Sequence, residues 1–126
     1  MIFDADVLIW ALRDNKRANK LIDATRDRRT TLVTYLELVQ GARDKVDLRL
    51  IRSYIKESGF NVLPLSENIG NRAAVYLEEY ALRSGLSMGD ALVAATATEH
   101  NDVLCTGNVK HFRHVADLEL RPFHPV

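Results

Sequence analysis

The sequence predicts a three-layer α/β/α fold in which helices cover both faces of a short, mainly parallel sheet of about four to five strands. Short apolar segments alternate with longer segments in which apolar residues recur at helical spacing. Because helices separate the strands, the strands cannot pair as hairpins and must be joined by right-handed crossovers. Most of the strand segments are short and apolar, as is typical of strands buried on both faces.

Three strands and four helices are expected in the first half of the chain. The strands are Met1–Phe3, Thr31–Val33 and Asn61–Leu63, and the helices cover residues 7–13, 15–25, 35–43 and 45–58. In the last of these helices Leu48, Ile51 and Ile55 recur on one face, and Gly59 follows as a C-terminal glycine. Pro64 ends the third strand, because proline cannot donate a hydrogen bond to the sheet.

The second half of the chain is expected to contain two long helices and the remaining strands. The helices cover residues 66–84 and 87–100, and the strands are Val103–Cys105 and Leu118–Pro122. No internal repeat, low-complexity tract or linker rich in Pro, Gly and Ser interrupts the chain. The length is that of one domain, so we expect residues 1–126 to form a single domain.

Composition and charge exclude several classes of protein. With 47% hydrophobic and 27% charged residues the chain can form a packed core, so disorder is not expected. The 17 basic and 17 acidic residues argue against a polybasic nucleic-acid binder or a membrane-surface protein, but they leave room for a local basic strip. A single cysteine, Cys105, permits no internal disulfide and suits a reducing compartment. Met1–Phe3 is followed at once by two aspartates, so we expect no signal peptide, no membrane span and a cytoplasmic location.

Polar side chains follow the predicted strands at several places. They are Asp4 and Asp6 after the first strand, Thr34 and Glu37 after the second, Asp90 at the start of its helix, and Thr106 and Asn108 after the fourth strand. Because parallel strands share one carboxyl edge, Asp4, Glu37 and Asn108 should converge there, and Asp90 joins them if its helix begins at that edge. Carboxylates this close would raise one another's pKa values. A divalent cation resolves that repulsion, and Mg²⁺ or Mn²⁺ matches an all-oxygen site.

The same carboxylates also have a structural interpretation as helix-start residues. Thr34-Tyr-Leu-Glu37 reads as a capping box, and Ser87-Met-Gly-Asp90 is close to one. Asp4 is likewise a suitable N-cap. No single one of these residues is specific for a metal site, whereas their combination at successive strand ends is.

The chain resembles the PIN domain family at successive motifs. Ile2–Ile9 is similar to the family's opening motif, a hydrophobic strand followed by Asp-x-(Asn or Asp), and Thr34–Ala42 to its second motif, an acidic residue on a helix that ends in Gly. Gly89–Ala97 resembles the third and most specific motif, and Leu104–Phe112 resembles the fourth. The resemblance spans nearly the whole chain in order. The length and layout are most similar to the VapC-type toxins of bacterial toxin–antitoxin pairs.

The resemblance implies a PIN-like fold and a magnesium-dependent endoribonuclease that a cognate VapB-type antitoxin holds inactive. A homodimer is also expected from the family. Carried over by position, Asp4, Glu37 and Asp90 would form the metal site for Mg²⁺ or Mn²⁺, and Asn108 would complete the catalytic set.

The resemblance also implies supporting roles around this site. Asp6 would orient the site and cap the first helix, and Thr106 would donate a hydrogen bond to a carboxylate or to a water on the metal. Asn108 departs from the commonest pattern, where an Asp stands, and His111 stands where many relatives carry an Asp. With one formal charge fewer a second metal would bind more weakly, so a one-metal and a two-metal mechanism both stay open.

Such a site would hydrolyse RNA phosphodiester bonds with a metal that activates water and stabilises charge on the phosphate. The expected products carry a 5′-phosphate and a 3′-hydroxyl, and neither a histidine nor the RNA 2′-hydroxyl is required. RNA binding also needs cations near the acidic site. Lys45, Arg49, Arg52 and Lys56 fall on one helix face and could each contact a phosphate. A solvated face opposite the apolar residues of that helix explains the same spacing.

Three further features allow either a functional or a purely structural interpretation. The helix beginning at Val7 is apolar around most of its surface, so Trp10 is either a core residue or a contact for a dimer partner or an antitoxin. His111 and His114 could bind a metal or do acid–base work as a pair, but we interpret them as exposed loop histidines. Cys105 lies in an apolar strand and is interpreted as a small core residue.

Two other functions compete with the nuclease. A PIN domain without catalysis, acting as a binding module, is supported by Asn108 alone. A haloacid-dehalogenase-like phosphatase would use Asp4 and Asp6 as nucleophile and acid after the first strand. Its lysine should precede the last acidic motif, whereas Lys110 follows Asp90, and the chain is short for that fold.

Overall fold

Five short strands form one parallel sheet at the centre of the molecule, in the order β3-β2-β1-β4-β5. Their bounds are β1 Ile2–Phe3, β2 Arg29–Thr31, β3 Asn61–Leu63, β4 Leu104–Thr106 and β5 Leu120–Pro122. The structure, a computed structural model, describes all residues from 1 to 126. The predicted parallel sheet is therefore confirmed, with β1 in the middle position.

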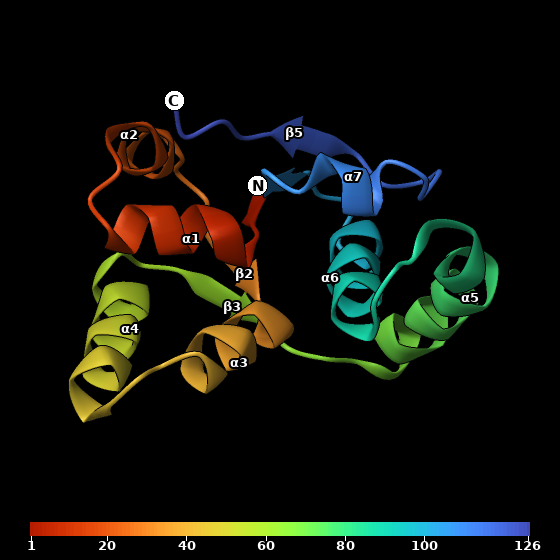
Figure 1. Cartoon of the computed structure of the whole chain (residues 1–126), viewed down its shortest axis with the longest axis horizontal. Coiled ribbons are helices and arrows are strands. Elements are labelled where there is room, and N and C mark those ends of the chain that lie inside the picture. Colours follow the sequence, from red (N-terminus) through yellow and green to blue (C-terminus); the bar gives the residue numbers. More distant parts are fainter.

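Seven helices connect and cover these strands. They are α1 Ala5–Leu12, α2 Lys16–Ala24, α3 Leu32–Gln40, α4 Lys45–Glu57, α5 Glu67–Ser84, α6 Met88–Glu99 and α7 Val109–Phe112. Helices α1, α2 and α4 lie on one side of the sheet and α5 and α6 on the other (Figure 1). The predicted three-layer α/β/α class is confirmed by this arrangement.

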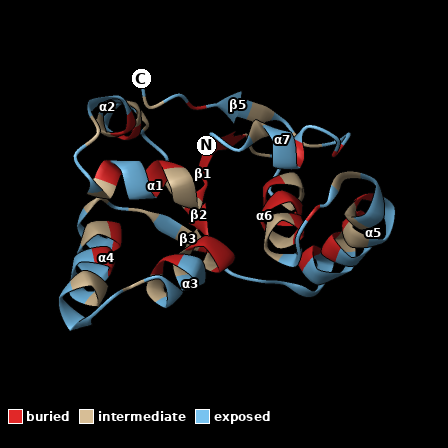
Figure 2. Ribbon diagram, viewed as in Figure 1, coloured by how far each residue is buried: buried red, intermediate tan, exposed pale blue.

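Alternation along the strands divides the buried side chains between two cores. Ile2 belongs to the core with α5 and α6, whereas the next residue, Phe3, belongs to the core with α1, α2 and α4. Leu104 and Cys105 of β4 divide in the same way, as the pleat of a strand requires. The buried residues accordingly gather on the central strands and on the helix faces turned toward them (Figure 2). No helix of the chain is both long and apolar enough to cross a membrane.

The start of α3 differs from the prediction by about one turn. The predicted strand Thr31–Val33 is wrong: β2 covers Arg29–Thr31, and Thr31 is the N-cap of α3, with its hydroxyl oxygen accepting from the Thr34 N–H at 2.9 Å. The capping box predicted from Thr34 to Glu37 is therefore wrong as well. Glu37 lies in the second turn of α3, where its side chain has no cap to complete. Helix capping therefore does not explain why a glutamate stands at position 37.

Two other caps match the sequence interpretation. Asp4 is the N-cap of α1 and accepts from the Ala5 N–H at 2.8 Å. Ser87 is the N-cap of α6 and accepts from the Asp90 N–H at 3.1 Å. Both helices begin beside the carboxyl edge of the sheet, so capping and site formation use the same residues.

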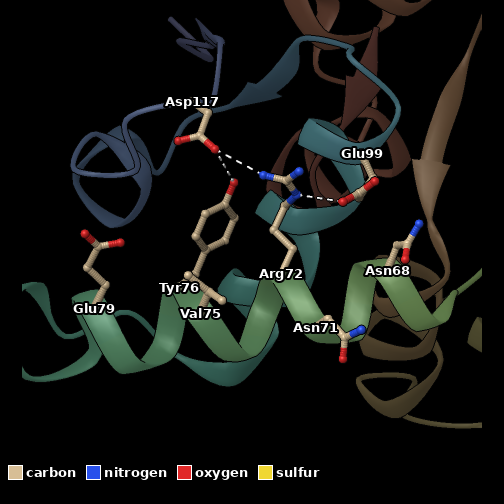
Figure 3. A pocket seen from close by; sticks show the side chains of 8 residues that line it. All are labelled: Asn68, Asn71, Arg72, Val75, Tyr76, Glu79, Glu99 and Asp117. Atoms are coloured by element: carbon tan, nitrogen blue, oxygen red, sulfur yellow. Dashed lines mark hydrogen bonds and ion pairs between the residues drawn. The ribbon is translucent and has the colours of Figure 1, made fainter.

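A polar pocket of about 400 Å³ lies away from that edge, between α5, α6 and the segment before β5. Its centre is Arg72, whose guanidinium donates to Glu99 at 2.8 Å and to Asp117 at 3.1 Å (Figure 3). The Tyr76 hydroxyl lies 3.4 Å from the same Asp117 carboxylate. These contacts tie α5 to α6 and to the chain before β5, and their charges are already paired. We therefore assign these contacts a structural role, holding α5, α6 and the segment before β5 together.

Candidate active site

The pairing of β1 with β4 brings Asp4 and Thr106 together just past the ends of the two strands. Phe3 pairs with Cys105, so the next residue of each strand lies side by side. The Thr106 hydroxyl donates to Asp4 Oδ2 at 2.8 Å, and its oxygen accepts from the Asn108 N–H at 3.0 Å. The hydrogen bond expected of Thr106 is therefore present, and it links the two central strand ends.

Asp6 binds the loop that follows β4. Its Oδ2 accepts from the Gly107 N–H at 2.8 Å, so the carboxylate fixes the backbone between Thr106 and Asn108. A Cβ on Gly107 would lie 2.5 Å from that oxygen, which is why this position needs glycine. The predicted capping role of Asp6 is wrong, since the cap of α1 is Asp4. The second oxygen, Oδ1, is buried without a hydrogen-bond partner.

Glu37 and Asp90 reach the same region from two different helices. Glu37 lies on α3, and its Oε1 packs so closely on α6 that a Cβ on Gly89 would be 2.7 Å away. Asp90 is the next residue of α6, and its negative charge raises the pKa of Glu37 in addition to the effect of partial burial. Gly89 therefore leaves the space in which the two carboxylates approach each other.

Burial and mutual repulsion make this edge of the sheet unfavourable for negative charge. Burial raises the pKa of Asp4 to about 6, although hydrogen bonds from Ala5 and Thr106 oppose that effect. The charges of Asp6 and Asp90 raise the Asp4 pKa further. Burial also raises the pKa of Asp6. The charge of Asp90 thus acts on both Asp4 and Glu37, so the three carboxylates lie in one region of the molecule.

Asn108 is the N-cap of α7, a short helix that the sequence did not indicate, and His111 lies within it. Asn108 is exposed at its N-terminus, and its side chain makes no capping hydrogen bond. His111 is not a loop histidine: it lies within α7, and its Nδ1 is 3.2 Å from Asp90 Oδ2. His114 makes no such contact with a carboxylate, so the two histidines do not act together as a pair.

The residues at this edge fit a divalent cation by charge and donor type. No three His, Cys, Asp or Glu side chains are close enough as they stand to enclose an ion. The donors are nevertheless carboxylates, which Mg²⁺ and Mn²⁺ prefer, and their charges repel one another without a cation. The unpartnered Asp6 Oδ1 is a further oxygen without a protein donor. Glu37 is exposed and Asp90 is only partly buried, so both side chains have room to turn toward an ion.

A groove of about 510 Å³ leads away from Glu37 between α1, α3 and α4. Its lining is largely apolar, with charged groups at the rim: Ile9, Leu12, Arg13, Glu37, Leu38, Gly41, Ala42, Arg43, Asp47, Leu50 and Ile51. The basic residues predicted on α4 are exposed but line no part of it: Lys45, Arg49, Arg52 and Lys56. The cations that line this groove together with Glu37 are Arg13 and Arg43, and no local pattern in the sequence indicated them.

Burial also bears on Cys105 and Trp10, for which the sequence allowed a structural interpretation. Cys105 is fully buried, and burial raises the pKa of its thiol to about 11, which agrees with a core residue. Trp10 and Ile9 remain 37% exposed on α1, so a part of that apolar helix is left uncovered.

Comparison with known proteins identifies the family. The PIN domain model matches residues 1–118. The chain is 33% identical over 116 residues to Ribonuclease VapC10 of Mycobacterium tuberculosis, which covers 89% of this chain and 85% of the relative. The match rules out the phosphatase alternative, which belongs to another fold family.

Solved structures agree with the fold. A toxin–antitoxin complex from Klebsiella pneumoniae contains a chain with 25% identity and a TM-score of 0.76, covering 99% of this chain and 97% of that one. VapBC-1 from nontypeable Haemophilus influenzae gives 24% identity and a TM-score of 0.80, covering 97% and 98%. Together with the strand-end carboxylates, these matches establish that the chain belongs to the PIN domain family, among the VapC proteins.

Proposed function

We propose that this protein is a metal-dependent endoribonuclease that hydrolyses RNA phosphodiester bonds and serves as the toxin of a toxin–antitoxin pair. The observation that carries the proposal is the convergence of Asp4, Glu37 and Asp90 at one edge of the sheet, where burial and the charge of Asp90 raise the pKa values of Asp4 and Glu37. A protein does not gain stability from such a cluster. A reaction that requires a bound cation would explain why these carboxylates are placed together.

Within the proposed site each side chain has a distinct task. Asp4, Glu37 and Asp90 would hold Mg²⁺ or Mn²⁺. When bound, such a cation lowers the pKa of water and stabilises the charge that builds on a phosphate. Thr106 fixes the orientation of Asp4 through their 2.8 Å hydrogen bond.

The loop after β4 would present Asn108 to the substrate. Asp6 holds that loop through the Gly107 N–H at 2.8 Å, and the Asn108 side chain is left exposed without a capping hydrogen bond. An amide in this place can donate to a phosphate oxygen, which a carboxylate cannot do. The site is therefore complete without the acid that most relatives carry here.

RNA must approach an acidic site, and the groove beside Glu37 provides positive charge for this approach. Arg13 and Arg43 line it, although Arg43 already donates to Asp47 at 2.8 Å. Arg13 is therefore the better candidate for a phosphate contact than the predicted row on α4. Each phosphate contact of this kind makes binding weaker as salt rises.

A VapB-type antitoxin is the proposed protein partner, because the similar structures are toxin–antitoxin complexes. The groove between α1, α3 and α4 suits an apolar segment of such a partner. An antitoxin segment bound in this groove would cover Glu37 and keep the RNA substrate away from it. Binding of the antitoxin would then be sufficient to inhibit the nuclease. Ile9 lines this groove, and its neighbour Trp10 is a further exposed apolar side chain of α1. A homodimer is proposed from the family only.

The proposal is tested by cleavage of end-labelled small RNA with antitoxin-free protein in Mg²⁺, Mn²⁺ or EDTA. The variant Asp90→Asn removes one carboxylate from the site, and Asp23→Asn removes an exposed charge from α2 as a matched control. We expect discrete cuts that require the metal, persist in Asp23→Asn and are lost in Asp90→Asn. Cleavage that survives EDTA and Asp90→Asn would contradict the proposal. Metal-loaded, folded protein that cuts no RNA would favour the binding module to which Asn108 points.

A further inference from the structure

We propose that His111 is a nitrogen ligand of the metal site and shifts its preference from Mg²⁺ toward Mn²⁺. This inference rests on the proposed metal site at Asp4, Glu37 and Asp90 and adds a donor of a different kind to it. Neither the carboxylates nor Asn108 supplies nitrogen to a cation, so the imidazole would be the only such donor at this edge.

The position of the imidazole carries the inference. His111 Nδ1 lies 3.2 Å from Asp90 Oδ2. Two neighbouring ligands on an octahedral ion, each about 2.1 Å from it, are about 3.0 Å apart. The two atoms are therefore already at the separation at which both can bind one ion. The ring is 57% exposed, so no packed neighbour has to move before a cation reaches it.

The backbone that carries His111 is held in place by its neighbours. Phe112 is 1% exposed and belongs to the core beneath α5 and α6, so it anchors α7 at the site. At the other end of α7 the Asn108 N–H donates to Thr106, which in turn donates to Asp4. The helix thus connects the backbone of His111 to the central strand ends.

The chemistry of the donor sets the metal preference. Carboxylates and water suit Mg²⁺, whereas imidazole binds first-row transition ions better. A neutral ring in place of a further acid also leaves the site with less negative charge for a hard cation. Replacing His111 should therefore weaken Mn²⁺ binding strongly and change Mg²⁺ binding little.

The test compares untagged wild-type protein with His111→Ala and His111→Asp, and uses His114→Ala as the matched control. His114 is exposed just beyond α7 and touches no carboxylate. Calorimetric titration with Mn²⁺ and with Mg²⁺ measures both affinities. Electron spin-echo modulation on the Mn²⁺-loaded protein reports whether a histidine nitrogen is bound directly to the ion.

We expect nitrogen modulation in wild type and His114→Ala and none in His111→Ala. We also expect His111→Ala to bind Mn²⁺ at least tenfold more weakly while its Mg²⁺ affinity changes less than threefold, and His111→Asp to gain Mg²⁺ affinity. Mn²⁺ bound without nitrogen modulation in wild type, or equal losses for both ions, would overturn the role of His111 and leave the carboxylate site intact. Absence of any Mn²⁺ or Mg²⁺ binding by folded wild-type protein would overturn the metal site itself.

Discussion

Asp4 is the only charged residue among the buried ones, so its replacement by asparagine should change the pH dependence of stability in the metal-free protein. Burial raises the folded-state pKa of Asp4 to about 6 from an ordinary value of 3.8. The folded protein therefore keeps this proton between about pH 4 and pH 6, whereas the unfolded chain releases it. The stability provided by the protonated form is complete below pH 4 and is lost as the pH rises through 6.

The size of the effect follows from the two pKa values. Their difference corresponds to about 3 kcal/mol of unfolding free energy lost by the wild type between pH 4 and pH 7. Asparagine carries no charge and still offers an oxygen to the Ala5 N–H, but its amide replaces the oxygen that accepts from Thr106, which costs about 1 kcal/mol. Asp4→Asn should thus be about 2 kcal/mol more stable than wild type at pH 7.5 and about 1 kcal/mol less stable at pH 4.

Urea unfolding followed by circular dichroism from pH 4 to pH 8, with EDTA present, measures this difference. The other raised carboxylates, Asp6 and Glu37, are present in both proteins, so the difference between them isolates Asp4. Adding Mn²⁺ at pH 7.5 should stabilise wild type and leave Asp4→Asn nearly unchanged, because binding to the folded state alone stabilises it. Parallel stability profiles for the two proteins over the whole pH range would refute the reasoning.

Three other changes test the space, the surface and the charge around the site. Gly89→Ala places a Cβ 2.7 Å from Glu37 Oε1, so the Glu37 side chain must move away. Because that side chain is flexible and exposed, the free energy of unfolding should change by less than about 0.5 kcal/mol. Because Glu37 is displaced from the proposed metal site, RNA cleavage should fall at least tenfold in a rate assay. Trp10→Ala should weaken binding of the cognate antitoxin at least tenfold by calorimetry. Arg13→Ala should weaken RNA binding and reduce by about one the slope of log affinity against log salt.

Each of these variants has a matched control in the chain. Gly70→Ala adds a Cβ that meets nothing within 4 Å, so it should preserve cleavage. Leu82→Ala removes a fully exposed apolar side chain from α5 and should leave antitoxin binding unchanged. Arg52→Ala removes a cation of the α4 row, which lines no part of the groove, and should keep the salt slope. If a control behaves like its partner variant, the role assigned to the partner is wrong.

The sequence predicted the sheet and the strand-end residues because both depend on local signals. An apolar strand followed by Asp4, and another followed by Thr106, must bring those residues together once the strands are parallel neighbours. The start of α3 was misplaced because Thr31 and Thr34 are both suitable caps. The pairing of Thr31 with Leu63 keeps the first threonine at the strand end, and no local pattern reports that pairing.

The contact of His111 with Asp90 and the cations of the groove were not predicted, for a different reason. His111 reaches Asp90 because Phe112 is buried and anchors a helix of only four residues, too short to show periodicity in the sequence. Arg13 and Arg43 line the same groove as Glu37 because α1, α3 and α4 meet there. Contacts of this kind depend on packing between distant segments, so sequence spacing does not reveal them.

The central claim is that this acidic edge hydrolyses RNA with water, and the ends of the products test it most directly. RNA would be cut in ¹⁸O-labelled water with Mn²⁺, and the products weighed by mass spectrometry, beside a substrate with a 2′-deoxy sugar at the cut position. We predict 5′-phosphates carrying ¹⁸O, 3′-hydroxyls, and cleavage of both substrates. Products ending in a 2′,3′-cyclic phosphate, with the deoxy substrate left uncut, would show that the 2′-hydroxyl is the nucleophile and would contradict the account.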